Sequence, residues 1–86
     1  MDNSNTKKIL ADNVRLLRAK KRFSQEAVAG FAQLGQSQIS DIENELANPN
    51  LETIIKIADA LNVKVRDLFE EWFLVEGLKS LKVEKL

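Results

Sequence analysis

The sequence predicts a small all-α domain built from five helices. Its 86 residues leave no room for a second core, since a domain usually has roughly 100–150 residues, so a single domain is expected. Apolar residues recur at helical spacing along most of the chain, and strand patterns are weak before the C-terminal segment. One proline and three glycines leave few breaks in these helical patterns.

The composition excludes several classes of site and function. Without cysteine or histidine the chain cannot form disulfides or the common thiolate and imidazole metal sites, so we expect no metal and no cofactor. No apolar run approaches the roughly 20 residues that cross a membrane. The N-terminal stretch MDNSNTKK lacks the apolar core of a signal peptide. We therefore expect a cytoplasmic, nucleoid-associated protein without a membrane partner.

The charges balance overall but are unevenly placed. Thirteen basic and thirteen acidic residues give a net charge of zero, which argues against a generally basic nucleic-acid surface. Five cations nevertheless fall within eight residues, uninterrupted by an acid: Arg15, Arg18, Lys20, Lys21 and Arg22. This run predicts either a solvated helix face or a place for phosphates.

The first two predicted helices span about 6–21 and 25–32. An apolar stripe at i, i+4 and i+7 marks the first helix, and Ser24 is a suitable N-cap for the second. The positions expected to face the core are Leu10, Val14, Leu17, Val28, Ala29 and Ala32.

Residues that favour loops and helix ends separate the next three predicted helices. Helix three runs from Gln36 to about Asn44, and a loop with Asn48-Pro49-Asn50 follows it. Asn50 is expected to cap helix four, and Asn62 to end it in a left-handed conformation. The expected apolar faces are Ile39 and Ile42 in helix three; Leu51, Ile54, Ile55, Ala58 and Leu61 in helix four; and Val65, Leu68, Phe69 and Trp72 in helix five.

The chain divides into a domain over 1–70 and a C-terminal extension over 71–86. The four consecutive apolar residues of the run WFLV would spread around a helix and cover more than one of its sides. A helix to about Ser80 is favoured over a hairpin with strands Trp72–Val75 and Leu81–Val83.

Two short helices joined by a tight turn, over about 25–44, form a helix-turn-helix plan. Small Ala29 allows the two helices to cross closely, and Leu34 and Ile39 fill the gap between them. The polar residues of helix three are then left on its outer face, at and near its N-terminus: Gln36, Ser37, Ser40 and Asp41.

From about Ile9 to Phe69 the chain resembles the phage repressor and Cro (XRE-type) family of helix-turn-helix DNA-binding domains. The segments that carry the resemblance are Ser24-Gln25-Glu26, Val28-Ala29, Leu34, Ile39-Ser40-Asp41-Ile42-Glu43, Pro49, Leu51-Glu52-Thr53, Ile57-Ala58 and Ala60-Leu61. The resemblance implies a five-helix lambda-repressor-like fold whose helix three enters the major groove.

The resemblance also assigns roles to individual residues. Gln36, Ser37 and Asp41 match base-reading positions. Gln25 matches a glutamine that touches a phosphate and braces the recognition helix, and Arg18 with Glu43 matches a semi-buried salt bridge. The residues expected to contact the DNA backbone or flank the reading positions are Gln25, Gln38, Ser40, Asn44, Arg15, Arg18, Lys21 and Arg22.

Three positions depart from the family pattern. Gln33 stands where the turn usually has glycine, and Glu45 where glycine often follows helix three. Gly35 occupies the N-cap of helix three, where serine or threonine is common. A left-handed conformation at Gln33 would cost about 1 kcal/mol, and the Glu45 charge would lie close to the DNA backbone.

We therefore expect a sequence-specific transcriptional regulator, a repressor or controller that binds a palindromic operator in double-stranded DNA as a homodimer. The surplus apolar side chains that could form the dimer interface are Trp72, Phe73, Leu74, Val75, Leu78 and Leu81. The alternatives are an antitoxin-type module whose C-terminal segment binds a toxin or another protein, and a helical oligomer that binds no nucleic acid. No nucleophile–base pair or phosphate-binding glycine loop is recognisable, so no enzymatic activity is expected.

Overall fold

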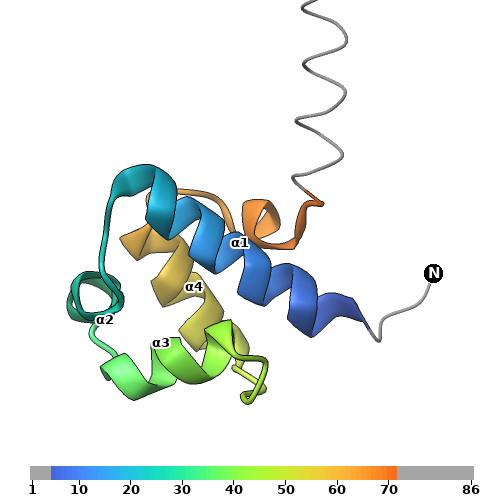
Figure 1. Ribbon diagram of the computed structural model, residues 1–86, viewed down its shortest axis with the longest axis horizontal. Coiled ribbons are helices and arrows are strands. Elements are labelled where there is room, and N and C mark those ends of the chain that lie inside the picture. Colours follow the sequence, from blue (N-terminus) through green and yellow to red (C-terminus); the bar gives the residue numbers. More distant parts are fainter. Residues whose placement is uncertain (1–4, 72–86) are drawn as a thin grey trace, which may run out of the picture.

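Four α-helices and one 3₁₀ helix make up the part of the chain that the structure, a computed structural model, describes, residues 5–71. Figure 1 shows α1 crossing the middle of the molecule, α2 seen end-on beside it and α3 along the lower edge. The all-α class is confirmed. The elements are α1 (Thr6–Lys21), α2 (Gln25–Ala32), α3 (Gln36–Glu43), α4 (Leu51–Ala60) and η2 (Val65–Phe69).

Side-chain caps start two of the helices where the sequence predicts them. Ser24 Oγ accepts a hydrogen bond from the Ala27 N–H at 3.0 Å, and Asn50 Oδ1 accepts one from the Thr53 N–H at 2.9 Å. Each cap pairs a backbone donor that the first turn of a helix leaves without an internal partner. The residues at which α2 and α4 begin are therefore determined by the capping side chains next to them in the sequence.

Left-handed residues make the turns that end the helices. Gln33 ends α2 with a φ of 58°, Glu45 follows α3 with a φ of 61°, and Asn62 follows α4 with a φ of 56°. The left-handed conformation expected at Asn62 is confirmed, and at Gln33, where the sequence left the shape of the turn open, the backbone is left-handed as well. Gln33 and Glu45 carry the backbone strain of a β-carbon in this conformation, which glycine would avoid.

The core lies between α1, α2, α3, α4 and η2. It contains the predicted apolar faces of the first three helices, all nearly or fully buried: Leu10, Val14, Leu17, Val28, Ala29, Ala32, Ile39 and Ile42. Buried Asn13 ties α1 to the end of η2, because its amide donates to the carbonyls of Leu68 (2.9 Å) and Glu70 (2.6 Å). The sequence patterns did not single out this contact.

The prediction for the face of α4 was partly wrong. Leu51 and Ile55, expected in the core, are 66% and 42% exposed, whereas Ile57, absent from the predicted face, is fully buried. The buried or half-buried set is Ile54, Ile57, Ala58 and Leu61, a stripe at i, i+3, i+4 and i+7. The segment is apolar on two adjoining sides, and packing against the other helices selects one of them.

The fifth helix is a short 3₁₀ turn and not an α-helix within the described residues. Leu68 is fully buried there, and Val65 and Phe69 are half-buried against the core. The extension over 72–86 lies outside the described residues, and with it the choice between helix and hairpin. None of the helices in residues 5–71 is long and apolar enough to cross a membrane.

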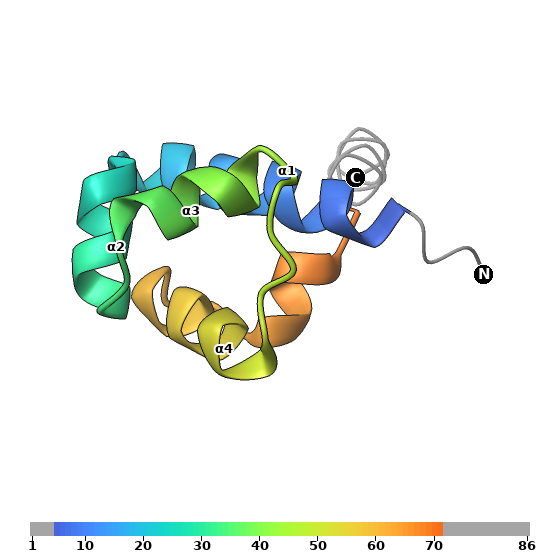
Figure 2. The ribbon, with the colours of Figure 1, turned by 90° about the horizontal axis from the view of Figure 1, so that it is seen from below.

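Helix α3 packs against α2 and α1 on its inner side and leaves its outer side uncovered. Ile39 and Ile42 anchor the inner side in the core. Figure 2, seen from below, shows α3 extending from the end of α2 along α1 in the upper part of the view, with α4 in the lower part. The fold thus presents α3 at one edge of the molecule.

Candidate nucleic-acid interface

The N-terminal end of α3 presents uncharged polar side chains. Gln36, Ser37 and Gln38 are exposed, and Asp41 is exposed one turn beyond Ser37. Gly35 precedes them as N-cap with an extended backbone, and the Gln38 amide oxygen accepts a hydrogen bond from its N–H at 2.9 Å. The side chain of Gln38 therefore supplies the reciprocal half of a capping box by pairing the N–H of the N-cap residue, a role the sequence reasoning missed.

Side chains of α3 leave amide and hydroxyl groups available for hydrogen bonds to base edges. A glutamine amide carries both a donor and an acceptor, and a serine hydroxyl can play either part. The two kinds of group match the donor and acceptor pattern that a base pair shows in the major groove. Asp41 adds an acceptor, at the rim of a shallow hollow of about 240 Å³ formed with the loop after α3.

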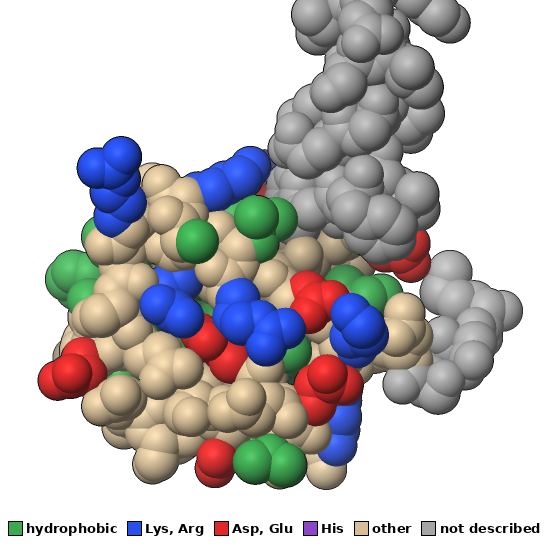
Figure 3. Space-filling model, viewed as in Figure 1, with side chains coloured by type: hydrophobic (Ala, Val, Ile, Leu, Met, Phe, Trp, Pro, Cys, Tyr) green, Lys and Arg blue, Asp and Glu red, His purple; other side chains and the backbone are tan. Residues whose placement is uncertain are grey.

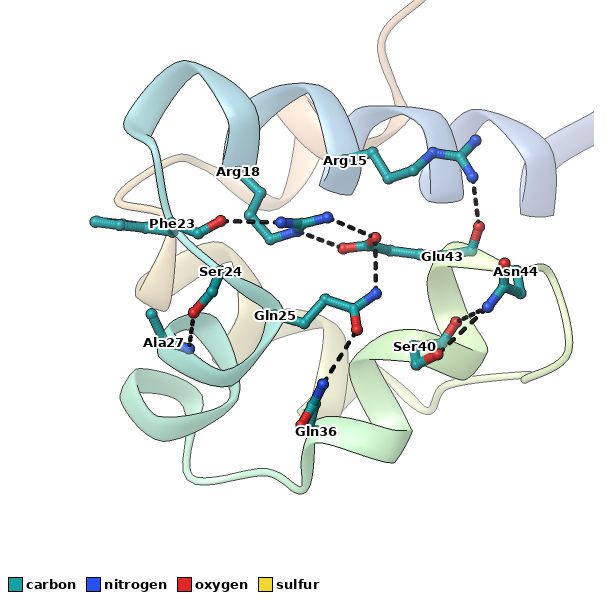
Figure 4. Close-up of polar contacts among 10 residues, drawn as sticks. All are labelled: Arg15, Arg18, Phe23, Ser24, Gln25, Ala27, Gln36, Ser40, Glu43 and Asn44. Atoms are coloured by element: carbon teal, nitrogen blue, oxygen red, sulfur yellow. Dashed lines mark hydrogen bonds and ion pairs between the residues drawn. The ribbon is translucent and has the colours of Figure 1, made fainter.

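A buried ion pair fixes α3 to α1 (Figure 4). Arg18 Nε donates to Glu43 Oε2 at 2.8 Å and Arg18 Nη2 donates to Glu43 Oε1 at 3.0 Å, so the pair is bidentate. The Glu43 side chain is only 3% exposed, and its hydrogen bond raises the pKa of the Arg18 guanidinium. The salt bridge that the resemblance implies is therefore present.

Gln25, the first residue of α2, lies between this ion pair and the tip of α3. Its Nε2 donates to Glu43 Oε1 at 3.1 Å, and its Oε1 accepts from Gln36 Nε2 at 3.5 Å. These contacts place the glutamine expected to touch a phosphate beside the glutamine expected to read a base. Figure 4 shows the two side chains pointing toward each other.

Arg15, which the basic run predicts as a contact to the DNA backbone, forms hydrogen bonds within the protein instead. Its Nη1 donates to the Glu43 carbonyl at 2.9 Å, and its Nη2 pairs with Asp12 at 2.6 Å. Lys8 pairs with the same carboxylate, and its hydrogen bond lowers the pKa of Asp12. Arg15 therefore holds the C-terminal end of α3 to α1.

The remaining predicted contact residues fall into two groups. Lys21 and Arg22 are exposed at the end of α1, just before Ser24 and Gln25. Asn44 is exposed beyond α3, but its amide donates to the Ser40 carbonyl at 2.9 Å and to the Ser40 hydroxyl at 3.3 Å. A phosphate contact through the Asn44 amide would require its rotation away from Ser40.

The surface charge reflects these pairings. Figure 3 shows Lys and Arg side chains alternating with Asp and Glu across the middle of the molecule, along the level of α1. Below them, at the level of α2 and α3, most of the visible surface is neither charged nor apolar. The candidate interface is thus polar and nearly neutral.

Four α-helices that include a short helix-turn-helix, with an exposed and polar second helix, define the helix-turn-helix class of DNA-binding proteins. The model of the helix-turn-helix family HTH_3 matches residues 14–68. The chain belongs to this phage repressor and Cro-like family of helix-turn-helix DNA-binding regulators, which is not a class of enzymes.

Several relatives share most of the chain. It is similar to the control protein C.SmaI of Serratia marcescens, with 38% identity over 86% of this chain and 83% of that protein. It is also similar to the control protein C.BamHI of Bacillus amyloliquefaciens, with 37% identity over 78% of this chain and 84% of that protein. The crystal structure of the restriction-modification controller protein C.AhdI from Aeromonas hydrophila superimposes with a TM-score of 0.69 at 34% identity, covering 71% of this chain and 92% of that one.

Proposed function

We propose that the chain is a sequence-specific regulator of transcription that inserts α3 into the major groove of double-stranded DNA. The observation that carries this proposal is the exposed pair Gln36 and Ser37 at the tip of a helix whose base is fixed by the Arg18–Glu43 ion pair. A rigid helix with free donors and acceptors at its end suits direct reading of base edges.

The proposed roles follow the placement of the side chains. Gln36 and Ser37 read bases, and Asp41 accepts a hydrogen bond from a cytosine N4 group further along the groove. Gln25, at the N-terminus of α2, contacts a phosphate, since free N–H groups and the helix dipole favour an anion there. Ser40 flanks this set, and Lys21 and Arg22 supply backbone contacts next to Gln25.

The proposed protein is a homodimer on a palindromic operator, with half-sites about 34 Å apart. The apolar residues expected at the interface lie outside the described residues, so this part of the proposal rests on their sequence alone. Sedimentation of the full chain at several concentrations tests it. A monomer at the concentrations that saturate DNA would contradict it.

Control of a restriction–modification system is the regulatory setting that the comparisons favour. The restriction-modification controller protein C.AhdI matches over 92% of its own chain, and the control proteins C.SmaI and C.BamHI match over 83% and 84% of theirs. The chain spans only 46% of the immunity repressor protein of Bacillus phage phi105. A toxin-binding role finds no support in these relatives.

The direct test is selection of bound DNA from a random double-stranded pool, followed by footprinting at two salt concentrations. We expect one enriched palindrome and protection of two half-sites. A chain that retards all DNA equally, or none, would contradict sequence-specific regulation.

A further inference from the structure

One buried side chain of α1 closes the C-terminal end of η2. The Asn13 amide donates to the Leu68 carbonyl at 2.9 Å and to the Glu70 carbonyl at 2.6 Å, and its NH₂ group has one hydrogen for each. Asn13 is 4% exposed, and its two bonds bridge 55 and 57 residues of sequence. The last carbonyls of a helix have no partner within that helix, so Asn13 supplies a donor from a distant element.

The two ends of η2 are held in different ways. At its start, the Asp67 carboxylate accepts from the Lys64 N–H at 2.9 Å, a contact within the helix itself. At its end, Glu70 has an extended backbone with φ −78° and ψ 147°. A 3₁₀ helix has poor internal hydrogen-bond geometry, so η2 alone is a weak support for the residues that follow it. The position of the chain at Glu70 therefore depends on the Asn13 amide.

Helix α1 also holds the C-terminal end of α3. Arg15, two residues after Asn13, donates to the Glu43 carbonyl at 2.9 Å. The helix packs against both α3 and η2, and Figure 1 shows α3 below α1 and η2 above it. A single helix thus fixes both the proposed reading helix and the point at which the chain leaves the domain.

We propose that Asn13 sets the spacing of the two operator half-sites by fixing the direction in which the chain leaves the domain at Glu70. This inference rests on the proposed function, in which the C-terminal extension joins two copies of the chain. Two reading helices must lie about 34 Å apart to occupy both half-sites at once. Because it is buried, Asn13 acts as a positioning residue and not as a DNA contact.

A loosened exit from the domain would change binding in two ways. The second domain could reach a half-site at several spacings, because the linkage would no longer prescribe one separation. Its effective concentration at the correct half-site would fall, since the same domain would sample more positions. The expected result is weaker binding at the selected spacing together with a smaller penalty for a wrong spacing.

Operators of altered spacing test this role. Two base pairs inserted between the half-sites of the selected operator turn one half-site by about 70° and move it by about 7 Å. The wild type should lose affinity by at least about 30-fold, and Asn13→Leu, which fills the site without a donor, by less than about 3-fold. A spacing penalty that is equal in Asn13→Leu and the wild type would overturn the proposal.

Two further variants separate this role from a general loss of stability. Two glycines inserted after Glu71 leave the Asn13 bonds in place but loosen the exit, so they should reduce the spacing penalty as Asn13→Leu does. Val28→Ala truncates a buried side chain of α2 and should keep the full penalty despite its lower stability. If the glycine insertion leaves the penalty unchanged, the proposal fails, even where Asn13→Leu does not fold.

An isolated half-site distinguishes this proposal from the proposed function. The affinity of Asn13→Leu for one half-site should stay within about twofold of the wild type, because Arg15 still holds α3. A loss as large as that on the full operator would show that Asn13 supports the domain and does not set spacing. If the wild type enriches no palindrome, the proposed function fails and this inference fails with it.

Discussion

Single residues set the shape of the reading surface. Ser37 and Gln36 are exposed because Ile39 and Ile42 occupy the opposite side of α3 and bury it. The sequence predicted this division, since helical periodicity specifies which side of a short helix is apolar. It did not predict that the Gln38 side chain would accept from the Gly35 N–H, although a glutamine three residues after an N-cap is a signal for this contact. It also did not predict that Asn44 would bond to Ser40, which depends on side-chain torsions that a pattern does not encode.

Gln33 offers a test at the residue scale. Its φ of 58° places a β-carbon in the left-handed region, so Gln33→Gly should raise the free energy of unfolding by about 0.5–1 kcal/mol. Urea denaturation measures this change. Gln33→Ala is the control, since it keeps the β-carbon and should bring no gain. A stability loss in Gln33→Gly would contradict strain at this turn.

Asn13 offers a second test. Its amide is the donor for the carbonyls of Leu68 and Glu70, so Asn13→Ala should lower the free energy of unfolding by about 2–3 kcal/mol. Thermal unfolding of the two proteins measures the difference. A loss below about 0.5 kcal/mol would mean that the contact between α1 and η2 contributes little.

At the scale of elements, α1 acts as the support that fixes α3. Arg18 and Arg15 both reach Glu43, one to its carboxylate and the other to its carbonyl. The family resemblance implied the first contact, whereas the basic run in the sequence suggested that Arg15 contacts the DNA backbone. The face of α4 was mispredicted for a related reason: Leu51 and Ile55 fit an apolar stripe, and only tertiary packing shows that the neighbouring stripe is buried.

Replacing only one residue of the Arg18–Glu43 ion pair should lower the free energy of unfolding. Arg18→Met leaves the Glu43 carboxylate buried without its partner, and about 3 kcal/mol of stability should be lost. Lys8→Met, which breaks an exposed ion pair of the same helix, is the control and should cost less than about 1 kcal/mol. Chemical denaturation compares the two, and equal losses would contradict the supporting role of the buried pair.

The ion pairs of α1 predict a weak dependence of stability on acid. Lys8 lowers the pKa of Asp12 from its ordinary value of 3.8, so the stabilisation is present above that value and is lost as pH falls through the lower, folded-state pKa. The pair is exposed and screened, so the contribution should stay below about 1 kcal/mol. Comparing the wild type with Asp12→Asn at pH 6 and pH 3 isolates it. A difference between the two proteins that grows as pH falls would contradict this sign.

The whole molecule is neutral, with thirteen basic and thirteen acidic residues, and this shapes how it can bind DNA. Arg15 and Arg18 already contact carboxylates, and the two other cations of the predicted contact set, Lys21 and Arg22, are exposed. The basic run in the sequence suggested a broad phosphate contact. The structure shows instead that two of its arginines support the fold, because acids distant in sequence or one turn away come to face them.

Because Arg15 and Arg18 pair with acids, the predicted contact set should give binding to DNA a shallow salt dependence. Each phosphate contact contributes about −0.9 to the slope of log K against log salt concentration, so a dimer with two or three contacts per half-site should show a slope of about −4 to −5. Arg22→Ala should reduce this slope, whereas Arg66→Ala, in η2, should not. A slope near −10 would contradict an interface dominated by hydrogen bonds.

The most direct measurement of the central claim is the affinity of the double variant Gln36→Ala, Ser37→Ala for the operator selected by the wild type. We expect binding to weaken by about 2–6 kcal/mol, the sum of two base contacts, with thermal stability unchanged because both side chains are exposed. Thr6→Ala, an exposed site in the first turn of α1, should bind as the wild type does. Operator affinity that is equal in the double variant and the wild type would contradict reading through the tip of α3.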